Sequence, residues 1–209
     1  PTGSGKTEAA LLWANGEKGF YTLPLKVSSN AIYSRIKDRY MYKDVALLHS
    51  DSLSSYFDGT DGQFTDRNTR YEQAKLFSYP LTVCTVDQLF KFVYKAPGTE
   101  IFAATLKYSK LIIDEIQSYS PKIVAALIYG LSELKRMEGK FAIITATFPP
   151  VLEFFMRKYG LIKDREYIFR DFSTTMGTDR HRIALFHEEF DFDRIAEDGY
   201  KKKVLVICN

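Results

Sequence analysis

The chain has 209 residues, of which 45% are hydrophobic and 26% are charged, the ordinary balance of a globular protein. A formal net charge of +3 is too small to establish a nucleic-acid partner, although it is compatible with a local basic patch. The sequence shows no apolar run that could span a bilayer and no signal peptide. We therefore expect a cytoplasmic location without membrane association.

The first seven residues read PTGSGKT, the end of the phosphate-loop pattern GxxxxGK[ST], and an apolar helical run follows. Glycines let backbone N–H groups surround phosphate oxygens, while Lys6 reaches the β- and γ-phosphates and Thr7 suits Mg²⁺. A Gly/Ser turn that merely caps a helix is the alternative. We favour a phosphate site formed by Thr2, Gly3, Ser4, Gly5, Lys6 and Thr7. The strand that feeds such a loop would precede Pro1, so we expect the domain to lack its first strand here.

Short apolar strands then alternate with helices, which predicts an α/β fold with a doubly wound, mainly parallel sheet. The predicted strands are Phe20–Leu23, Val45–His49, Leu81–Thr85, Leu111–Asp114 and Phe141–Thr145. The predicted helices are Lys6–Asn15, Ser28–Tyr42, Thr69–Phe77, Val86–Tyr94, Lys122–Met137 and Pro150–Lys158. The polar stretch Leu48–Asp66 reads as a long surface loop.

A composition change near residue 170 predicts a domain boundary. We expect one domain over residues 1–170, a linker poor in apolar residues over 171–181, and the truncated start of a second domain over 182–209. The second domain is expected to begin with three elements, namely a strand at Arg182–Phe186, a helix near Phe192–Lys202 and a strand at Val204–Cys208.

Two acids follow directly after the fourth predicted strand. Ligands of parallel α/β sheets bind at the carboxyl ends of the strands. There, Asp114 suits the Mg²⁺ shell of a nucleotide, and Glu115 suits the positioning or deprotonation of water. Solvated loop acids are the alternative, but the phosphate loop favours a nucleotide site. Thr145 and Thr147 end the next strand, which we take to be central; they either relay the nucleotide state or satisfy local backbone groups.

Two further segments, LPLKVSSN and TVDQLF, each lead from a strand into a helix N-terminus. Polar side chains at such positions can hold a nucleic-acid backbone without reading its sequence. The candidates are Lys26, Ser28, Asn30, Thr85 and Gln88. Helix capping alone would explain Ser28, and Thr85 or Asp87, and on these residues alone it is the favoured interpretation.

Taken in order, PTGSGKT, LPLKVSSN, TVDQLF, DEIQ and TAT resemble the motifs of a superfamily-two DExD/H-box helicase. The resemblance extends to about Arg170 and implies a first RecA-like P-loop NTPase lobe, followed by the entry into a second lobe. The longer blocks PTGSGKTEAALLWA, LPLKVSSNAIYSRI, DEIQSYSP and ITATFPP are similar to the helicase part of the CRISPR-associated helicase–nuclease of type I systems.

The resemblance implies ATP-driven movement along single-stranded DNA, 3′ to 5′, after recruitment to a Cascade-bound R-loop. It implies ATP and Mg²⁺ as cofactors, and an HD nuclease domain in cis or in trans. It implies that Lys6, Asp114 and Glu115 are catalytic, that Thr7 and Asp114 bind Mg²⁺, and that Thr145 and Thr147 couple hydrolysis to lobe movement. Gln117 stands where the family carries Asp or His, so it is the candidate link to that coupling pair.

The three histidines are scattered and form no HD signature, so we expect no nuclease site in this chain. Because arginine fingers come from the second lobe in this superfamily, the isolated chain is expected to be nearly inactive as an ATPase. Two other functions remain open: a superfamily-two motor that acts on RNA or duplex DNA outside CRISPR, and a non-catalytic nucleic-acid-binding lobe.

Overall fold

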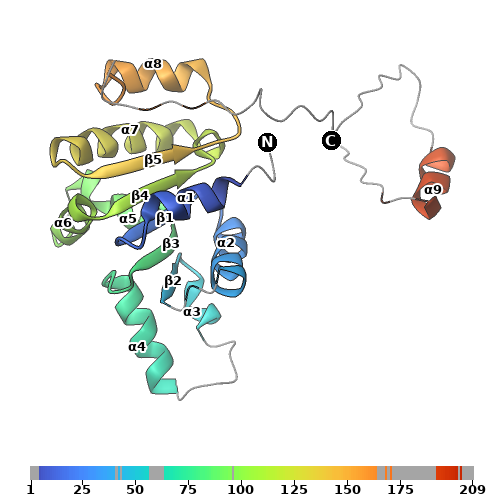
Figure 1. Cartoon of the computed structure of the whole chain (residues 1–209), viewed down its shortest axis with the longest axis horizontal. Coiled ribbons are helices and arrows are strands. Elements are labelled where there is room, and N and C mark those ends of the chain that lie inside the picture. The colour runs from blue at the N-terminus through green and yellow to red at the C-terminus, as the bar shows by residue number, and fades with distance from the viewer. Residues whose placement is uncertain are drawn as a thin grey trace. The chain divides into compact units, whose positions relative to one another are not determined.

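The structure is a computed structural model that describes residues 5–40, 42, 44–56, 64–95, 97–163, 168, 170, 192–201 and 203 (Figure 1). The chain divides into two compact units, Pro1–Phe169 and Arg170–Asn209. In the second unit the structure describes α9 (Phe192–Lys201), a helix expected from the sequence. The predicted linker and the two predicted strands on either side of α9 lie outside the described residues.

Five parallel strands form the sheet of the first unit. They are β1 (Gly19–Leu23), β2 (Val45–Leu48), β3 (Leu81–Thr85), β4 (Lys110–Asp114) and β5 (Lys140–Ile144). Their spatial order is β2-β3-β1-β4-β5, and every neighbouring pair is parallel. The structure therefore confirms the predicted parallel sheet, with each strand within one residue of its predicted bounds.

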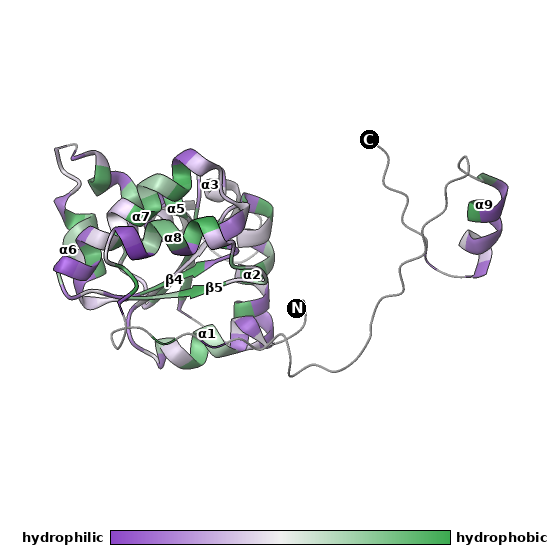
Figure 2. Ribbon diagram, turned by 90° about the horizontal axis from the view of Figure 1, so that it is seen from above, coloured by the Kyte–Doolittle hydropathy of each residue, from purple (hydrophilic) through white to green (hydrophobic). Residues whose placement is uncertain are grey.

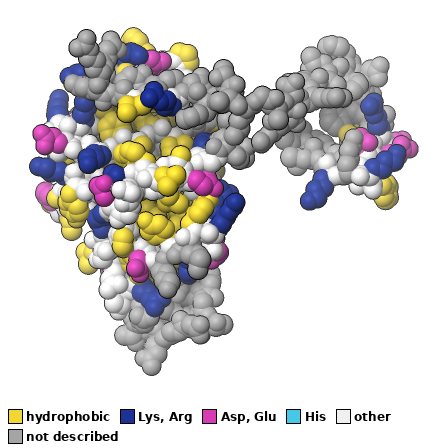
Figure 3. All heavy atoms as spheres, viewed as in Figure 1, with side chains coloured by type: hydrophobic (Ala, Val, Ile, Leu, Met, Phe, Trp, Pro, Cys, Tyr) yellow, Lys and Arg dark blue, Asp and Glu magenta, His cyan; other side chains and the backbone are white. Residues whose placement is uncertain are grey.

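Strand β5 is the last strand of the described sheet rather than a central one, which corrects the sequence interpretation. Its side chains are half-buried or exposed, whereas those of the other four strands are buried. In Figure 3, hydrophobic side chains reach the surface over the region where Figure 1 draws β5 and α1 (Lys6–Ala14). The edge of the sheet at β5 therefore has no neighbouring strand among the described residues.

Side chains of alternate strand residues pack into two separate hydrophobic clusters, one on each face of the sheet. Phe20 of β1 belongs to one cluster and Tyr21 to the other. Helices α1 and α2 (Lys26–Arg39) cover the Tyr21 side. Helices α6 (Glu100–Tyr108), α7 (Pro121–Arg136) and α8 (Pro150–Lys158) cover the Phe20 side. Figure 2 shows them and α1 on opposite sides of β4 and β5. The sheet is thus doubly wound.

The remaining helices are α3 (Ser52–Ser55), α4 (Phe64–Lys75), α5 (Val86–Leu89) and the 3₁₀ helices η1 (Phe90–Tyr94) and η2 (Ile116–Ser118). The sequence did not predict α6. The predicted loop Leu48–Asp66 was wrong in part, because it contains α3 and the start of α4. Among the described residues, no helix combines the length and apolar character that a bilayer crossing requires.

Candidate nucleotide site

The described part of the phosphate loop turns at Gly5 and enters α1 at Lys6. Gly5 has a φ of 76°, a left-handed conformation that costs glycine no steric penalty. Its carbonyl accepts the hydrogen bond from the Ala9 N–H at 2.9 Å, so the turn is continuous with the helix. Lys6 and Thr7 therefore stand at a helix N-terminus, where anions are favoured. The predicted contacts Thr2, Gly3 and Ser4 lie outside the described residues.

The two acids at the end of β4, Asp114 and Glu115, lie in different environments. Asp114 is buried, with 5% of its surface exposed. Glu115 has a φ of 52°, which is uncommon for a residue with a side chain. The Glu115 N–H donates to the Ile144 carbonyl at 2.9 Å and so ties this turn to the end of β5. The left-handed turn places Glu115 in the solvent-accessible part of the site.

Lys6 and Glu115 are 109 residues apart in the chain and form an ion pair, with 2.5 Å between Nζ and Oε1. Burial alone would raise the pKa of Glu115, but hydrogen bonds from Lys6 and Gln117 and the Lys6 charge lower it below its usual value. Glu115 is therefore ionised at neutral pH. The contact brings the predicted phosphate-binding lysine and the predicted base together.

Tyr21, which the sequence did not single out, supports Asp114 from β1. The fully buried Tyr21 hydroxyl donates to Asp114 Oδ2 at 2.7 Å. Burial, followed by the Asp114 charge, raises the pKa of Tyr21, so its hydroxyl remains a donor. A tyrosine within a buried strand requires a polar partner, and this requirement was the available sequence signal.

Asp114 also has a free oxygen. Its buried Oδ1 atom has no hydrogen-bond partner among the described residues, and burial raises the pKa of the carboxyl group. A buried carboxylate oxygen without a partner is costly unless a ligand or ion completes its shell. Mg²⁺ at phosphate sites is commonly held by one or two protein oxygens together with the phosphates. Asp114, with the buried Thr7 hydroxyl, fits such a shell.

Gln117 bridges the second acid to the end of β5. Its Nε2 donates to Glu115 Oε2, while its Oε1 accepts from the Thr145 hydroxyl. The Thr145 hydroxyl is shared with the Thr147 carbonyl at 2.6 Å and accepts from the Thr147 N–H at 3.3 Å. The Thr145 hydroxyl therefore contacts both Gln117 and a local backbone group, and its coupling role stays a prediction. Thr147 contributes its backbone carbonyl and N–H to these contacts.

Three of the five predicted nucleic-acid contacts lie on α2, and two of them contact residues that follow β2. Lys26 pairs with Asp51 at 2.7 Å, and Asn30 Oδ1 lies 2.8 Å from His49 Nε2. Ser28 is half-buried in the first turn of this helix, which begins at Lys26 with Leu25 as its N-cap. The capping interpretation of Ser28 was therefore wrong.

The other two predicted contacts are Thr85 at the end of β3 and Gln88 on the following helix, α5. Thr85 is buried and is the N-cap residue of α5, but its side chain makes no capping hydrogen bond. The Gln88 Nε2 donates to Asp87 Oδ2 at 2.6 Å. Gln88 also lines a cavity of about 280 Å³ with Lys75 and Lys91, two cations that the sequence analysis did not select.

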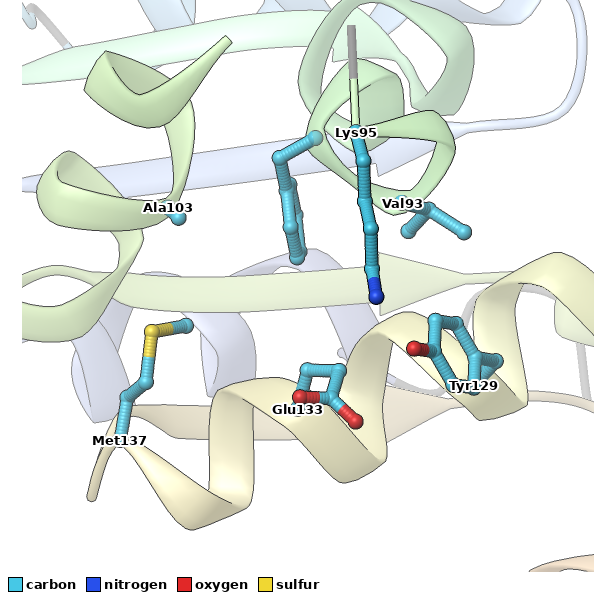
Figure 4. A pocket seen from close by; sticks show the side chains of 7 residues that line it. Val93, Lys95, Ala103, Tyr129, Glu133 and Met137 are labelled. Atoms are coloured by element: carbon cyan, nitrogen blue, oxygen red, sulfur yellow. The ribbon is translucent and has the colours of Figure 1, made fainter.

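A second hollow lies away from these residues. It has a volume of about 160 Å³ and lies between η1, α6 and α7 (Figure 4). Its lining includes Lys95, Tyr129 and Glu133, and none of the predicted site residues. Pockets for drug-sized ligands usually exceed about 300 Å³, so this hollow adds nothing to the nucleotide site.

Known proteins resemble the chain in both sequence and structure. Residues 1–155 match the model of the DEAD/DEAH box helicase family. The CRISPR-associated nuclease/helicase Cas3 of Methanothermobacter thermautotrophicus is 33% identical, over all of this chain and 27% of that protein. The putative CRISPR-associated nuclease/helicase Cas3 of Methanocaldococcus jannaschii is 30% identical, over 79% of this chain and 24% of that protein.

Among solved structures, T. fusca Cas3–AMPPNP has a TM-score of 0.63 and 25% identity, over 76% of this chain and 19% of that one. T. fusca Cas3–ADP has a TM-score of 0.61 and 24% identity, over 80% of this chain and 21% of that one. These likenesses confirm the predicted RecA-like fold, and the chain spans about a quarter of the length of the curated relatives that it matches. The chain belongs to the DEAD/DEAH box helicase family, and within that family it is similar to the CRISPR-associated helicase–nucleases, as its motifs predicted.

Proposed function

We propose that the chain binds ATP and Mg²⁺ and contributes half of the ATP site of a translocase that moves along single-stranded DNA in a type I CRISPR interference system. The main support for this proposal is a series of contacts from Lys6 through Glu115 and Gln117 to Thr145. These contacts join the phosphate loop, the acid pair and the end of β5. In this proposal residues 1–170 are the first RecA-like lobe, 171–181 are a linker and 182–209 open the second lobe.

Each side chain has a role that follows from its position. Lys6 binds the β- and γ-phosphates from the helix N-terminus. Glu115, ionised and half-exposed, orients the attacking water and accepts its proton. Thr7 and Asp114 would hold Mg²⁺, which neutralises phosphate charge when bound. Gln117 fixes the second oxygen of Glu115 and transmits its position to Thr145.

The Lys6–Glu115 pair opposes nucleotide binding. An incoming phosphate must take Lys6 from Glu115, because the two groups already satisfy each other's charge. Both side chains are partly exposed, at 21% and 31%, so solvent limits the pair to about 1 kcal/mol or less. Removing the Glu115 charge should therefore strengthen nucleotide binding by up to about fivefold while it removes the base.

Nucleotide affinity and turnover of matched variants test this arrangement. Glu115→Gln is expected to bind AMPPNP as tightly as the wild type or more tightly and to lose hydrolysis, whereas Lys6→Ala is expected to lose binding. Glu153→Gln changes an exposed ion pair on α8 and serves as the matched control that alters neither. Hydrolysis by Glu115→Gln at the wild-type rate would refute the base assignment.

The second lobe matters for how turnover is measured. In phosphoryl transfer, an arginine from a neighbouring element accelerates the reaction by about 10³–10⁵-fold. We therefore expect this chain alone to bind nucleotide and hydrolyse it slowly. Turnover is best compared in a protein that carries both lobes.

The DNA contacts, the 3′ to 5′ direction, recruitment by Cascade to an R-loop, and an HD nuclease in cis or in trans are proposals that rest on the similarity to Cas3 proteins. Stimulation of ATP hydrolysis by single-stranded DNA, and not by RNA of the same length, is the expected result. Stimulation by RNA alone would instead favour a motor outside CRISPR.

A further inference from the structure

A buried histidine at the end of β2 contacts an exposed asparagine of α2. His49 has 3% of its surface exposed, whereas Asn30 is exposed. Their Nε2 and Oδ1 atoms are 2.8 Å apart. His49 has no part in the nucleotide site, and it does not belong to any cluster of three or more metal-ligating side chains among the described residues.

Hydrogen bonding fixes which nitrogen of His49 carries the proton. The Asp51 backbone N–H donates to His49 Nδ1 at 3.2 Å, so Nδ1 is the acceptor. In a neutral imidazole the proton then lies on Nε2. Nε2 therefore donates to Asn30, and the asparagine must turn its oxygen toward His49. This orientation directs the two N–H donors of the Asn30 amide away from His49.

Asp51 also links the pair to Lys26. Its carboxylate accepts from Lys26 Nζ at 2.7 Å, while its backbone amide holds His49. Lys26 and Asn30 are four residues apart and lie on one face of α2. Contacts therefore run from Lys26 through Asp51 and His49 to Asn30. They hold the Lys26 ammonium group and the Asn30 amide next to each other on one face of α2. Positive charge and N–H donors are what phosphodiester oxygens require.

We propose that His49 is a positioning residue that turns the Asn30 amide so that its N–H donors bind the phosphate backbone of a nucleic-acid strand. This inference rests on the proposed function and specifies part of its nucleic-acid contact. Because a phosphate contact carries no base information, the effect is independent of nucleotide sequence.

The charges that face His49 make the arrangement depend on pH. Burial lowers the pKa of His49 below its ordinary value; Lys26 on α2 lowers it further, while Asp51 after β2 and Asp87 on α5 oppose the shift. His49 is therefore neutral at pH 7. Below the lowered pKa, Nδ1 gains a proton and can no longer accept from the Asp51 N–H. Nucleic-acid affinity is then expected to fall at acid pH.

The test measures binding of fluorescein-labelled oligothymidine to the full chain by anisotropy. Asn30→Ala and His49→Leu are each expected to weaken binding about five- to tenfold, the loss of roughly one hydrogen bond. His49→Gln retains an N–H donor near the position of Nε2 and is expected to restore most of the affinity. In the Asn30→Ala background, His49→Leu should have no additional effect, because His49 acts through Asn30.

Salt dependence separates this contact from a charged one. Lys26→Ala should lower the slope of log K against log salt by about one, whereas Asn30→Ala and His49→Leu should leave the slope unchanged. Thermal unfolding of each variant identifies effects that come from misfolding, and Asn30→Ala, at an exposed position, provides a variant that keeps the fold.

The binding experiment distinguishes failure of the proposed function from failure of the role proposed for His49. If the wild type does not bind oligothymidine, the proposed function is refuted, and this inference with it. If the wild type binds and Lys26→Ala weakens binding, but Asn30→Ala and His49→Leu do not, only the role of His49 is wrong. Additive losses in the double variant would also overturn it.

Discussion

Tyr21→Phe tests whether the hydrogen bond from Tyr21 on β1 stabilises the buried Asp114 carboxylate. The change removes one hydroxyl, which donates to Asp114 Oδ2 at 2.7 Å, and leaves the packing of the ring in place. A hydrogen bond to a charged group contributes about 1.5–3 kcal/mol. Since Tyr21 is fully buried, solvent does not replace the bond. For a domain of this size the loss corresponds to a decrease in Tm of about 3–12 °C.

The loss should depend on pH in a specific direction. The pKa of Asp114 is raised, chiefly by burial, so the folded state binds this proton more tightly than the unfolded state. The ionised carboxylate therefore costs stability above the raised pKa, and that cost disappears as the pH falls through it. Tyr21 offsets part of the cost. The loss of unfolding free energy caused by Tyr21→Phe should therefore be largest near neutral pH and should decrease toward acid pH.

Urea unfolding at a series of pH values, between about 5 and 8, measures this dependence. Tyr56→Phe is the matched control, because the Tyr56 hydroxyl donates to the Leu47 carbonyl at 3.0 Å and accepts from the Leu47 N–H at 3.1 Å. Those backbone groups do not titrate, so the deficit of this control should be constant. A Tyr21→Phe deficit that is equally constant, or smaller than about 0.5 kcal/mol, would refute the reasoning.

Two other changes test the coupling contacts and the packing. Thr145→Val should preserve nucleotide binding and reduce DNA-stimulated phosphate release, because it breaks the hydrogen bond to Gln117. Thr147→Val should reduce phosphate release less. Equal reductions by the two variants would argue against a link through Gln117. Gly130→Ala should destabilise the first unit by about 1–3 kcal/mol, because a Cβ there would lie 2.5 Å from the Phe90 ring. Gly199→Ala, where a Cβ meets nothing within 4 Å, is the control, and equal thermal stability of both variants would contradict the packing argument.

The sequence predicted the sheet well because parallel strands buried on both faces are nearly continuous apolar runs. It missed α6, whose buried positions include Thr105, a residue that carries no clear apolar signal. It also missed α3, a four-residue helix of SLSS. Ser52 within it exchanges hydrogen bonds with the backbone of His49, three residues earlier, so local side-chain contacts outweigh weak helix propensity there.

The site could be predicted as far as topology allows. Parallel strand ends meet at one edge, which brought Lys6, Asp114 and Glu115 together in prediction and in structure. A buried strand tyrosine signals the need for a polar partner, but the partners of Tyr21 and His49 could not be predicted, because they depend on where individual hydroxyl and imidazole groups point. The functional roles assigned to the phosphate-loop, coupling and nucleic-acid residues stay predictions until the variants are measured.

The left-handed backbone of Glu115 sets a limit on engineering this protein for stability. A side chain in that conformation costs about 1 kcal/mol or more relative to glycine, so a purely thermodynamic selection would favour glycine there and remove the proposed base. Glu138 has the same type of backbone, with a φ of 64°, but follows α7 outside the site. Glycine at position 138 would relieve the strain and leave the candidate site intact, whereas glycine at position 115 would relieve it and remove the proposed base.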